Sequence, residues 1–531
     1  MRAAPSSSCW GSFAAGLAGV AVFVALTLPT LPHGAVTGTG QDEWYNMMRA
    51  LRALYEHGDP SYFIHPALFY ELLAMIYGGV RVRLALGGAA SSGQFLDYVL
   101  THEAQFLDLA RCTALACGAL AVQAGAWLAG ELAGGGAGLL AALLLASLPL
   151  LRTMAVSIRV DTLALAMWLA AAALLVRHGR APTRRTRWVA AAGIGVAAAA
   201  NYPGALLLLP FVWLEWQTIA ARSTLLPRIG AGCGIAGAVF LALNPYAVID
   251  LPTFLRWFTF QANVALETHP NAAPPAAAHY LDVLRAQGAP AMAACAAGCL
   301  AALRLRTAGG ALGGFALAYL AAFSAMRSQY DRFALPALAL LCVVGAAWLC
   351  ALATRLDKRA GAAVAAAASA ATLWLARPTI PPPAPAVPLE TDYRADMFEW
   401  ITTHLSPTAT LLFESDTLPR LQTAYDPAAP DSPFSRAMRE AFERLNPRLP
   451  HRILKAQFIA AIYNYDPALL DQDDVYFLGS SQTRHALADT PERMTVPAAF
   501  YAALDPRATV VHQSSGYHEL LTLYAVRPRP D

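Results

Sequence analysis

Long apolar runs fill the chain between Gly11 and Arg377, separated by polar connections. Each run holds about 20 residues, mostly alanine, leucine, valine and glycine, and a helix of that length crosses a bilayer. The pattern therefore predicts an α-helical polytopic membrane protein with about eleven transmembrane helices. The runs lie near residues 11–31, 109–131, 134–152, 158–176, 188–200, 202–220, 229–247, 288–305, 309–326, 332–353 and 360–376.

The first run is long for the apolar part of a cleaved signal peptide, and no small-residue cleavage site follows it. We therefore expect an uncleaved first membrane helix.

A different pattern begins at Leu389, where helix-like and strand-like segments alternate. It predicts a small soluble α/β domain with a mainly parallel sheet. The expected helices are 396–404, 436–445 and 451–463, and the expected strands are 410–414, 475–479, 509–513 and 520–526. The chain then divides into a membrane domain (1–377), a stiff proline-rich linker (378–388) and a soluble domain (389–531). That domain is expected either to recognise an acceptor or partner, or to be a passive structural cover.

Composition agrees with this division and excludes some functions. Of the 531 residues only 14% are charged, whereas soluble domains carry about 25%. The net charge of +3 is small and no Lys/Arg cluster is interleaved with aromatics, so nucleic-acid binding is not expected. The eight cysteines contain no CxxC pair and are interpreted as small buried hydrophobic residues.

Arginine-rich connections set the expected orientation. Loops rich in Lys and Arg stay in the cytoplasm, and a count of helices from a cytoplasmic N-terminus puts four such connections on the inner side: 177–187, 222–228, 304–306 and 355–359. The same count puts residues 33–108, residues 247–287 and the soluble domain outside. The Ala/Arg-rich, Lys-poor composition suggests a bacterial protein of the cytoplasmic (inner) membrane.

The first external loop holds Asp42 and Glu43 directly after the first helix. Residues 44–57 and 66–77 have the apolar spacing of short helices that lie in the membrane interface. Such helices would hold both carboxylates and His65 at the level of a lipid headgroup. Capping of the first short helix by Asp42 and Glu43 is the structural alternative, and a turn before Pro66 is the alternative for His65.

Asp161 opens the fourth apolar run on the same external side. A carboxylate beside an apolar run is costly unless it faces a cavity or a partner, although it also suits a helix N-cap. Arg159 is a possible partner. Arg111, Arg327 and Arg332 also fall outside by the count, where binding of a phosphate explains arginines and snorkelling to headgroups is the alternative.

The order of these motifs resembles the GT-C superfamily of membrane glycosyltransferases over residues 11–377. The closest likeness is to the branch that contains protein O-mannosyltransferases, the aminoarabinose transferase of lipid A and RgtA/B/C/D-like bacterial enzymes. The motifs are the acidic pair, HPALFYELL at 65–73, Arg111, RVDTLAL at 159–165 and NYPGALLLLP at 201–210. The segment from Asn244 to Pro252 and RFALP at 332–336 are also similar.

The resemblance implies transfer of a sugar, with inversion, from a polyprenyl-phosphate carrier to an acceptor outside the cytoplasm. It implies that Asp42 is the general base and that Glu43, His65 and Asp161 orient hydroxyl groups. Arg111, Tyr330 and Arg332 are the implied phosphate contacts, and Arg159 and Tyr202 complete the implied substrate-binding set. Asn201 stands where many relatives carry lysine, which leaves the phosphate to another cation. We expect no essential metal or other cofactor besides the lipid-linked donor.

Two other functions remain open from the sequence. A transporter or flippase of a lipid-linked glycan also needs membrane helices, charge and a headgroup site, but we find no internal repeat of the kind that transporters carry. A catalytically inactive membrane scaffold that presents the soluble domain is the second alternative, and an intact acidic pair argues against it.

Overall fold

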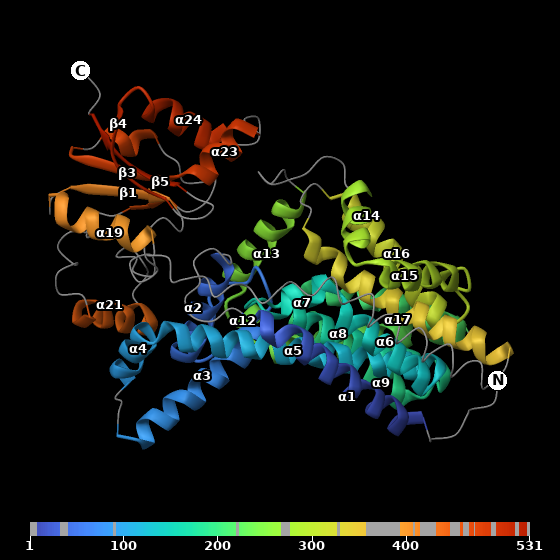
Figure 1. The fold of residues 1–531 in the computed structure, drawn as a ribbon. Helices are drawn as coiled ribbons and strands as arrows, with labels where there is room; N and C mark the ends of the chain where they lie inside the picture. The colour runs from blue at the N-terminus through green and yellow to red at the C-terminus, as the bar shows by residue number, and fades with distance from the viewer. Residues whose placement is uncertain are drawn as a thin grey trace.

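The computed structural model describes residues 8–31, 41–88, 92–218, 222–266, 277–326, 330–356, 393–406, 409–414, 432–445, 457–459, 467–471, 473–489, 495–515 and 520–527. A bundle of long helices forms the larger part, and a sheet with its own helices lies beyond one end of that bundle (Figure 1).

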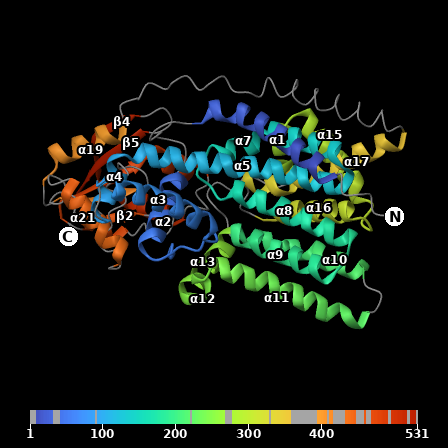
Figure 2. The same cartoon turned by 90° about the horizontal axis from the view of Figure 1, so that it is seen from below.

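The bundle helices run alongside one another (Figure 2). They are α1 (Ser8–Thr27), α5 (Glu103–Ala133), α6 (Gly135–Ser147), α7 (Pro149–Ala155), α8 (Asp161–Arg180), α9 (Arg184–Ala200), α10 (Leu208–Thr218), α11 (Leu225–Leu243), α15 (Ala289–Ala302), α16 (Ala308–Ser324) and α17 (Asp331–Leu356). Each predicted run coincides with one or more of these helices, except 360–376, which lies outside the described residues.

Length and composition alone identify fewer certain membrane spans than the sequence predicted. Among the described residues, five helices are long and apolar enough to cross a bilayer, and α6 with α7, bent by 66°, makes a possible sixth. Helices α15 and α16 are apolar but shorter. The multi-helix membrane character is supported, and the count of about eleven stays a prediction.

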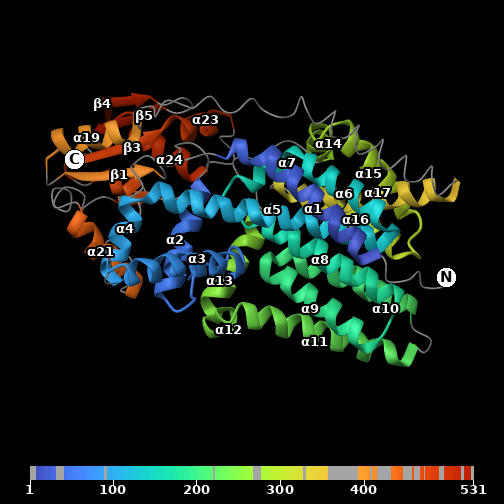
Figure 3. The same ribbon diagram turned by 60° about the horizontal axis from the view of Figure 1, so that its bottom comes forward.

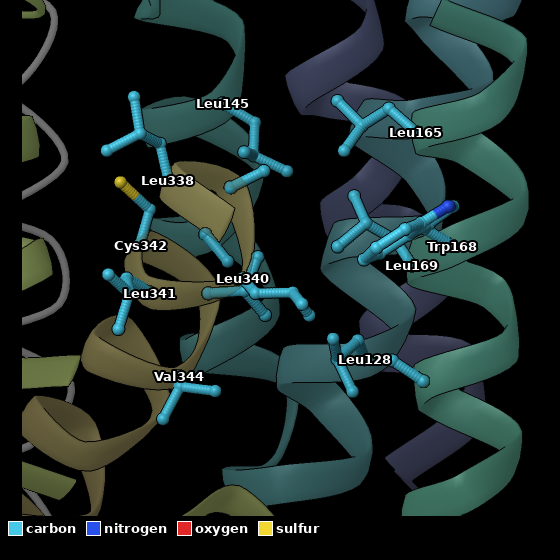
Figure 4. Packing of buried hydrophobic residues seen from close by; sticks show 14 of the residues in the cluster. Leu128, Leu145, Leu165, Trp168, Leu169, Leu338, Leu340, Leu341, Cys342 and Val344 are labelled. Carbon is cyan, nitrogen blue, oxygen red and sulfur yellow. The ribbon is translucent and has the colours of Figure 1, made fainter. Parts of the chain in front are cut away.

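Helices α5, α6, α8 and α17 form the centre of the bundle around Leu128, Leu145, Trp168 and Leu340 (Figure 4). Small residues let neighbouring helices approach closely: a Cβ atom added at Gly345 of α17 would collide with the backbone carbonyl of Ala294 in α15. Such close contacts are typical of membrane helices, whose association depends on van der Waals packing because lipid is as apolar as the side chains.

A platform of three helices covers the end of the bundle nearest the sheet (Figure 3): α2 (Gln41–Tyr55), α3 (Leu68–Leu86) and α4 (Ser92–Thr101). The predicted helices at 44–57 and 66–77 are confirmed, although α2 begins at Gln41 and α3 extends further. Their position in the membrane interface stays a prediction, and α4 was not predicted. The platform shares one apolar cluster with α5, which includes Met47, Phe69, Phe95 and Phe106.

Helices α12 (Tyr246–Ile249), α13 (Leu251–Leu266) and α14 (Ala277–Ala286) lie between bundle helices α11 and α15 in the sequence.

The five-stranded sheet has the order β2-β1-β3-β5-β4. Its strands are β1 (Thr410–Glu414), β2 (Gln457–Ile459), β3 (Val475–Ser480), β4 (Ala508–Ser515) and β5 (Leu520–Val526). The helices of this part of the chain are α19 (Tyr393–His404), α21 (Pro433–Leu445), α23 (Ser481–Asp489) and α24 (Thr495–Leu504), of which α21 packs on the platform.

Two expectations about this region were wrong. The sheet is mixed rather than mainly parallel: β2, β1 and β3 are parallel, whereas β5 is antiparallel to both β3 and β4. Ser515 pairs with Leu520, and a connection that short can join only antiparallel strands. The predicted helix at 451–463 contains strand β2, because pairing with β1 overrides a weak local preference for helix. The predicted linker at 378–388 lies outside the described residues.

The arginine-rich connections meet at the bundle end opposite the platform. Arg180 donates to the carbonyl of Leu132 at 3.1 Å, and Trp213 donates to the carbonyl of Leu305 at 2.9 Å. Glu215 lies near Arg187 and Arg228. The connections 177–187, 222–228 and 304–306 therefore share one end, as the sequence count required.

Candidate functional site

A buried ion pair joins the first turn of α2 to α5. The guanidinium of Arg111 donates through Nη2 and Nε to the two carboxylate oxygens of Glu43, at 2.7 and 3.3 Å. Both side chains are at most 1% exposed. The N–H of Ile158 also donates to Glu43, at 3.1 Å, so several donors satisfy the buried carboxylate.

Arg111 lies inside α5 rather than at its start, because the helix begins at Glu103. Its Nη1 donates to Asp108 at 3.2 Å. The expectation that Arg111 contacts a carrier phosphate stays a prediction, and the described contacts connect this arginine to the acidic pair.

A second contact fixes α2 against the turn before α8. The amide of Asn46 donates to the carbonyl of Ile158 at 2.7 Å, one turn along α2 from Glu43. Its Oδ1 accepts from Arg49 at 3.1 Å and from the hydroxyl of Tyr70 at 3.2 Å. The start of α2 is therefore held to the same short segment that leads to Arg159 and Asp161.

Asp42 lies in the first turn of α2, next to Glu43. Its side chain is outside the described part of the structure. Its backbone belongs to the second position of α2.

A cavity of about 350 Å³ lies where α8, α16 and α17 meet the His65 segment. It brings together four residues predicted from distant parts of the sequence: His65, Asp161, Tyr202 and Arg332. Asn201 is also part of the wall. Asp161 begins α8, which agrees with the sequence prediction that this carboxylate opens a membrane helix.

Aromatic side chains form much of the remaining wall. They include Trp168, Tyr319, Phe323 and Phe258. The hydroxyl of Tyr202 donates to the carbonyl of Phe63 at 2.8 Å, which holds the segment before His65 against the bundle. The cavity is thus largely apolar with a few polar groups, the usual composition of a small-molecule site.

Arg332 is the only lysine or arginine among the described residues that line the cavity. It lies at the start of α17, with its guanidinium 4.5 Å from the centre of the Tyr330 ring. Tyr330 is half-buried beside the cavity rather than in its wall, as is Arg159. Arg332 and Asn201 therefore line the same cavity, so a cation is present in the wall that lacks the lysine of many relatives.

The sequence interpretation missed three polar residues that support this end of the bundle. Arg49 lies 3.2 Å from the centre of the Tyr62 ring and, together with Asn46, belongs to the network on α2. Asn244 accepts from the N–H of Ala67 at 2.7 Å and is 4% exposed, so it anchors the turn that carries His65. The similarity of the Asn244 segment to the GT-C superfamily was the only available signal, since lone polar residues carry no spacing pattern.

Comparison with known proteins gave matches only among solved structures. No family model matches the chain, and no curated protein matches it. ArnT from Cupriavidus metallidurans, in the apo state, aligns with a TM-score of 0.53 and 15% identity, covering 96% of this chain and 97% of ArnT. ArnT bound to undecaprenyl phosphate aligns with a TM-score of 0.53 and 14% identity, covering 98% of both chains.

The archaeal oligosaccharyltransferase AglB from Archaeoglobus fulgidus, in complex with an inhibitory peptide and a dolichol-phosphate, aligns with a TM-score of 0.55 and 13% identity. The match covers 94% of this chain and 72% of AglB. Both relatives are GT-C membrane glycosyltransferases.

This chain has the GT-C fold. The resemblance expected from the sequence motifs is thereby confirmed at the level of the fold. Because the match to ArnT extends over nearly the whole of both chains, it includes the sheet-containing part as well as the helix bundle.

Proposed function

We propose that this chain is an integral-membrane glycosyltransferase. It moves a sugar from a polyprenyl-phosphate donor to a hydroxyl group of an acceptor on the extracytoplasmic side of the inner membrane. The observation that carries the proposal is the cavity in which His65, Asp161 and Arg332 meet, at the bundle end where α2 begins. The polyprenyl phosphates found with ArnT and AglB support the same class of donor here.

The proposed reaction is a single inverting displacement. The acceptor oxygen attacks the anomeric carbon while Asp42 takes the acceptor's proton. The bond between that carbon and the phosphate oxygen breaks, and the lipid phosphate leaves with the electron pair. Arg332 stabilises the charge on the leaving phosphate, since a preorganised guanidinium matches phosphate oxygens.

The remaining residues position these groups. Glu43, held by Arg111 and by the Ile158 N–H, fixes the first turn of α2 and so the direction of Asp42. His65 and Asp161 bind sugar hydroxyls from the cavity wall.

The other predicted contacts keep supporting roles. Tyr202 contributes a wall of the cavity, Tyr330 supports Arg332, and Arg159 lies in the turn that α2 contacts. The soluble domain (389–531) sits on the acceptor side, joined to the membrane domain (1–377) through residues 378–388.

Substitution of the proposed base tests this function. Asp42→Asn keeps the size of the side chain and removes the proton acceptor, so transfer from a polyprenyl-phosphate sugar should fall about 10²–10⁴-fold. Asp282→Asn, on the exposed face of α14, is the matched control and should retain activity. Mass spectrometry of envelope glycans and glycoproteins, with wild type and each variant, measures the product. An unchanged product profile for Asp42→Asn, with normal membrane insertion, would remove Asp42 from the reaction.

One observation favours transport of a lipid-linked glycan as a second candidate. The span formed by α6 and α7 is broken by a 66° bend, and Arg152 of α7 is 5% exposed. Transporters use broken helices at their binding sites. If the protein is a transporter, vesicles reconstituted with the Asp42→Asn variant should still move a lipid-linked glycan across their membrane. Neither the wild type nor the variant should then form a glycosidic bond.

A further inference from the structure

A second cavity, of about 320 Å³, lies at the bundle end opposite the proposed sugar-transfer site. Three arginines from two helices line it: Arg184 and Arg187 of α9, and Arg228 of α11. Trp188, the lining residue furthest along α9, lies thirteen residues before Asn201 of the first cavity, a distance of about 20 Å along the helix. The two cavities are therefore separate sites.

A buried carboxylate holds this arginine cluster in place. Glu215 of α10 is fully buried and accepts from Arg187 Nε at 2.5 Å and from His178 at 2.8 Å. Arg228 Nη1 lies 4.0 Å from its other oxygen. The three guanidiniums outnumber this single carboxylate, so the cavity keeps an excess of positive charge and attracts an anion.

Trp188 places the cavity at a boundary between water and lipid. Its ring is 40% exposed, and the guanidinium of Arg184 lies 4.2 Å from the ring centre. Val189 and Leu226, neighbours in sequence of the lining residues, are 44% and 78% exposed. Tryptophan with arginine beside exposed apolar side chains is typical of the membrane interface.

The chemistry of the cavity fits one kind of molecule. Guanidiniums bind phosphate oxygens through paired donors, and Ser223 and Thr224 add hydroxyl groups to the wall. The exposed apolar side chains next to the cavity suit acyl chains. We propose that this cavity binds the headgroup phosphate of an anionic phospholipid, in the leaflet opposite the sugar-transfer cavity. The proposal does not depend on the glycosyltransferase assignment.

The test uses the full-length protein purified in detergent, with dioleoylphosphatidylglycerol or dioleoylphosphatidylcholine added at equal concentration. Native mass spectrometry measures the lipid retained, and the shift in thermal midpoint measures stabilisation. Wild type should retain phosphatidylglycerol in preference to phosphatidylcholine. Arg184→Gln with Arg228→Gln should weaken phosphatidylglycerol binding about thirtyfold, since each arginine near an anionic surface contributes roughly fivefold.

Arg304→Gln with Arg306→Gln is the matched control. It removes the same charge from a neighbouring exposed connection at the same end and should bind phosphatidylglycerol like wild type. If both double variants lose phosphatidylglycerol binding equally, the effect is one of overall charge and the proposed site is wrong. Equal binding of both lipids by the wild type would also overturn the proposal. Inorganic phosphate at matched ionic strength is the last arm. If inorganic phosphate stabilises the protein as much as phosphatidylglycerol does, the bound phosphate does not come from a lipid headgroup, and the site binds a soluble phosphate anion instead. Gel filtration confirms that each variant is folded.

Discussion

At the scale of single residues, the described member of the acidic pair, Glu43, is bound on several sides. Glu43 is buried and bound by Arg111 and by a backbone N–H, whereas its neighbour Asp42 belongs to the same helical turn. Adjacent residues on a helix point about 100° apart, so one can anchor the helix while the other faces elsewhere. The pair that looked uniform in the sequence combines a positioning residue with the proposed base.

Loss of Glu43 should destabilise the protein strongly. Glu43→Ala leaves the guanidinium of Arg111 buried without its main partner, and removal of one member of a buried pair costs about 3–5 kcal/mol. Asp108→Asn is the matched control, because Asp108 contacts the same arginine but is 33% exposed. Thermal unfolding of the detergent-purified variants measures both. A midpoint for Glu43→Ala no lower than that of Asp108→Asn would contradict this role.

Arg332 should control the use of the lipid-phosphate donor. Arg332→Gln removes charge-assisted hydrogen bonds worth roughly 1.5–3 kcal/mol, so kcat/KM for the donor should fall about 10–150-fold. Arg332→Lys should recover part of the loss, since it restores the charge but not the paired donors. Arg285→Gln, on α14 and 60% exposed, is the control. Equal activity of the Arg332→Gln and Arg285→Gln variants would exclude Arg332 from the site.

At the scale of elements, helix α21 connects the sheet-containing part to the platform. Met438 and Ala441 are buried in the cluster formed by α2, α3 and α4. Arg444 donates to both oxygens of Asp97 in α4, at 2.9 Å each. The N–H of Phe434 donates to Glu56 at the end of α2. The helix whose first turn carries Asp42 is therefore also in contact with the C-terminal, sheet-containing part.

A charge placed in this contact should release α21. Met438→Asp puts a carboxylate into an apolar cluster, which is unfavourable unless the helix undocks. Hydrogen exchange should then increase in α21 and α4 while the bundle core stays protected. Glu440→Asp, at an exposed position of the same helix, should leave exchange unchanged. If α4 in the Met438→Asp variant is as well protected from hydrogen exchange as in the wild type, the α21 contact does not hold the sheet-containing part to the platform.

At the scale of the whole molecule, the two ends of the bundle differ in charge and chemistry. One end holds the platform and the sheet (Figures 1 and 2). The cavity with Asp161 and Arg332 lies at that end, and the other end gathers the arginine-rich connections. The positive-inside rule predicts that the arginine-rich end faces the cytoplasm. We therefore expect the sheet-containing part to lie outside.

Labelling of single cysteines measures this orientation. The substitutions are made in a variant without native cysteines. Any outer membrane is permeabilised while the inner membrane stays intact, and a membrane-impermeant maleimide is then added. Under these conditions Thr403→Cys on α19 should react. Ala181→Cys, exposed in the connection between α8 and α9, should react only after the inner membrane is opened. The reverse pattern would invert the topology and place the Asp161 cavity on the cytoplasmic side.

Local sequence patterns predicted most of the helices and strands. Apolar runs determined where the bundle helices lie, because a long apolar segment in lipid must satisfy its backbone hydrogen bonds within itself. The run that became α8 and the strand at Leu520–Val526 were both predicted from such patterns. The antiparallel half of the sheet and strand β2 were not, since pairing between strands depends on neighbours distant in sequence.

The sequence by itself determined the membrane character, the acidic and basic candidates and their likeness to a known fold, because hydrophobicity and motif order are local properties of the chain. Only the tertiary structure decided which candidates meet. It placed His65, Asp161, Tyr202 and Arg332 around one cavity and bound Arg111 to Glu43. A buried charge takes the partner that packing brings within hydrogen-bond distance, and separation along the chain does not reveal that partner.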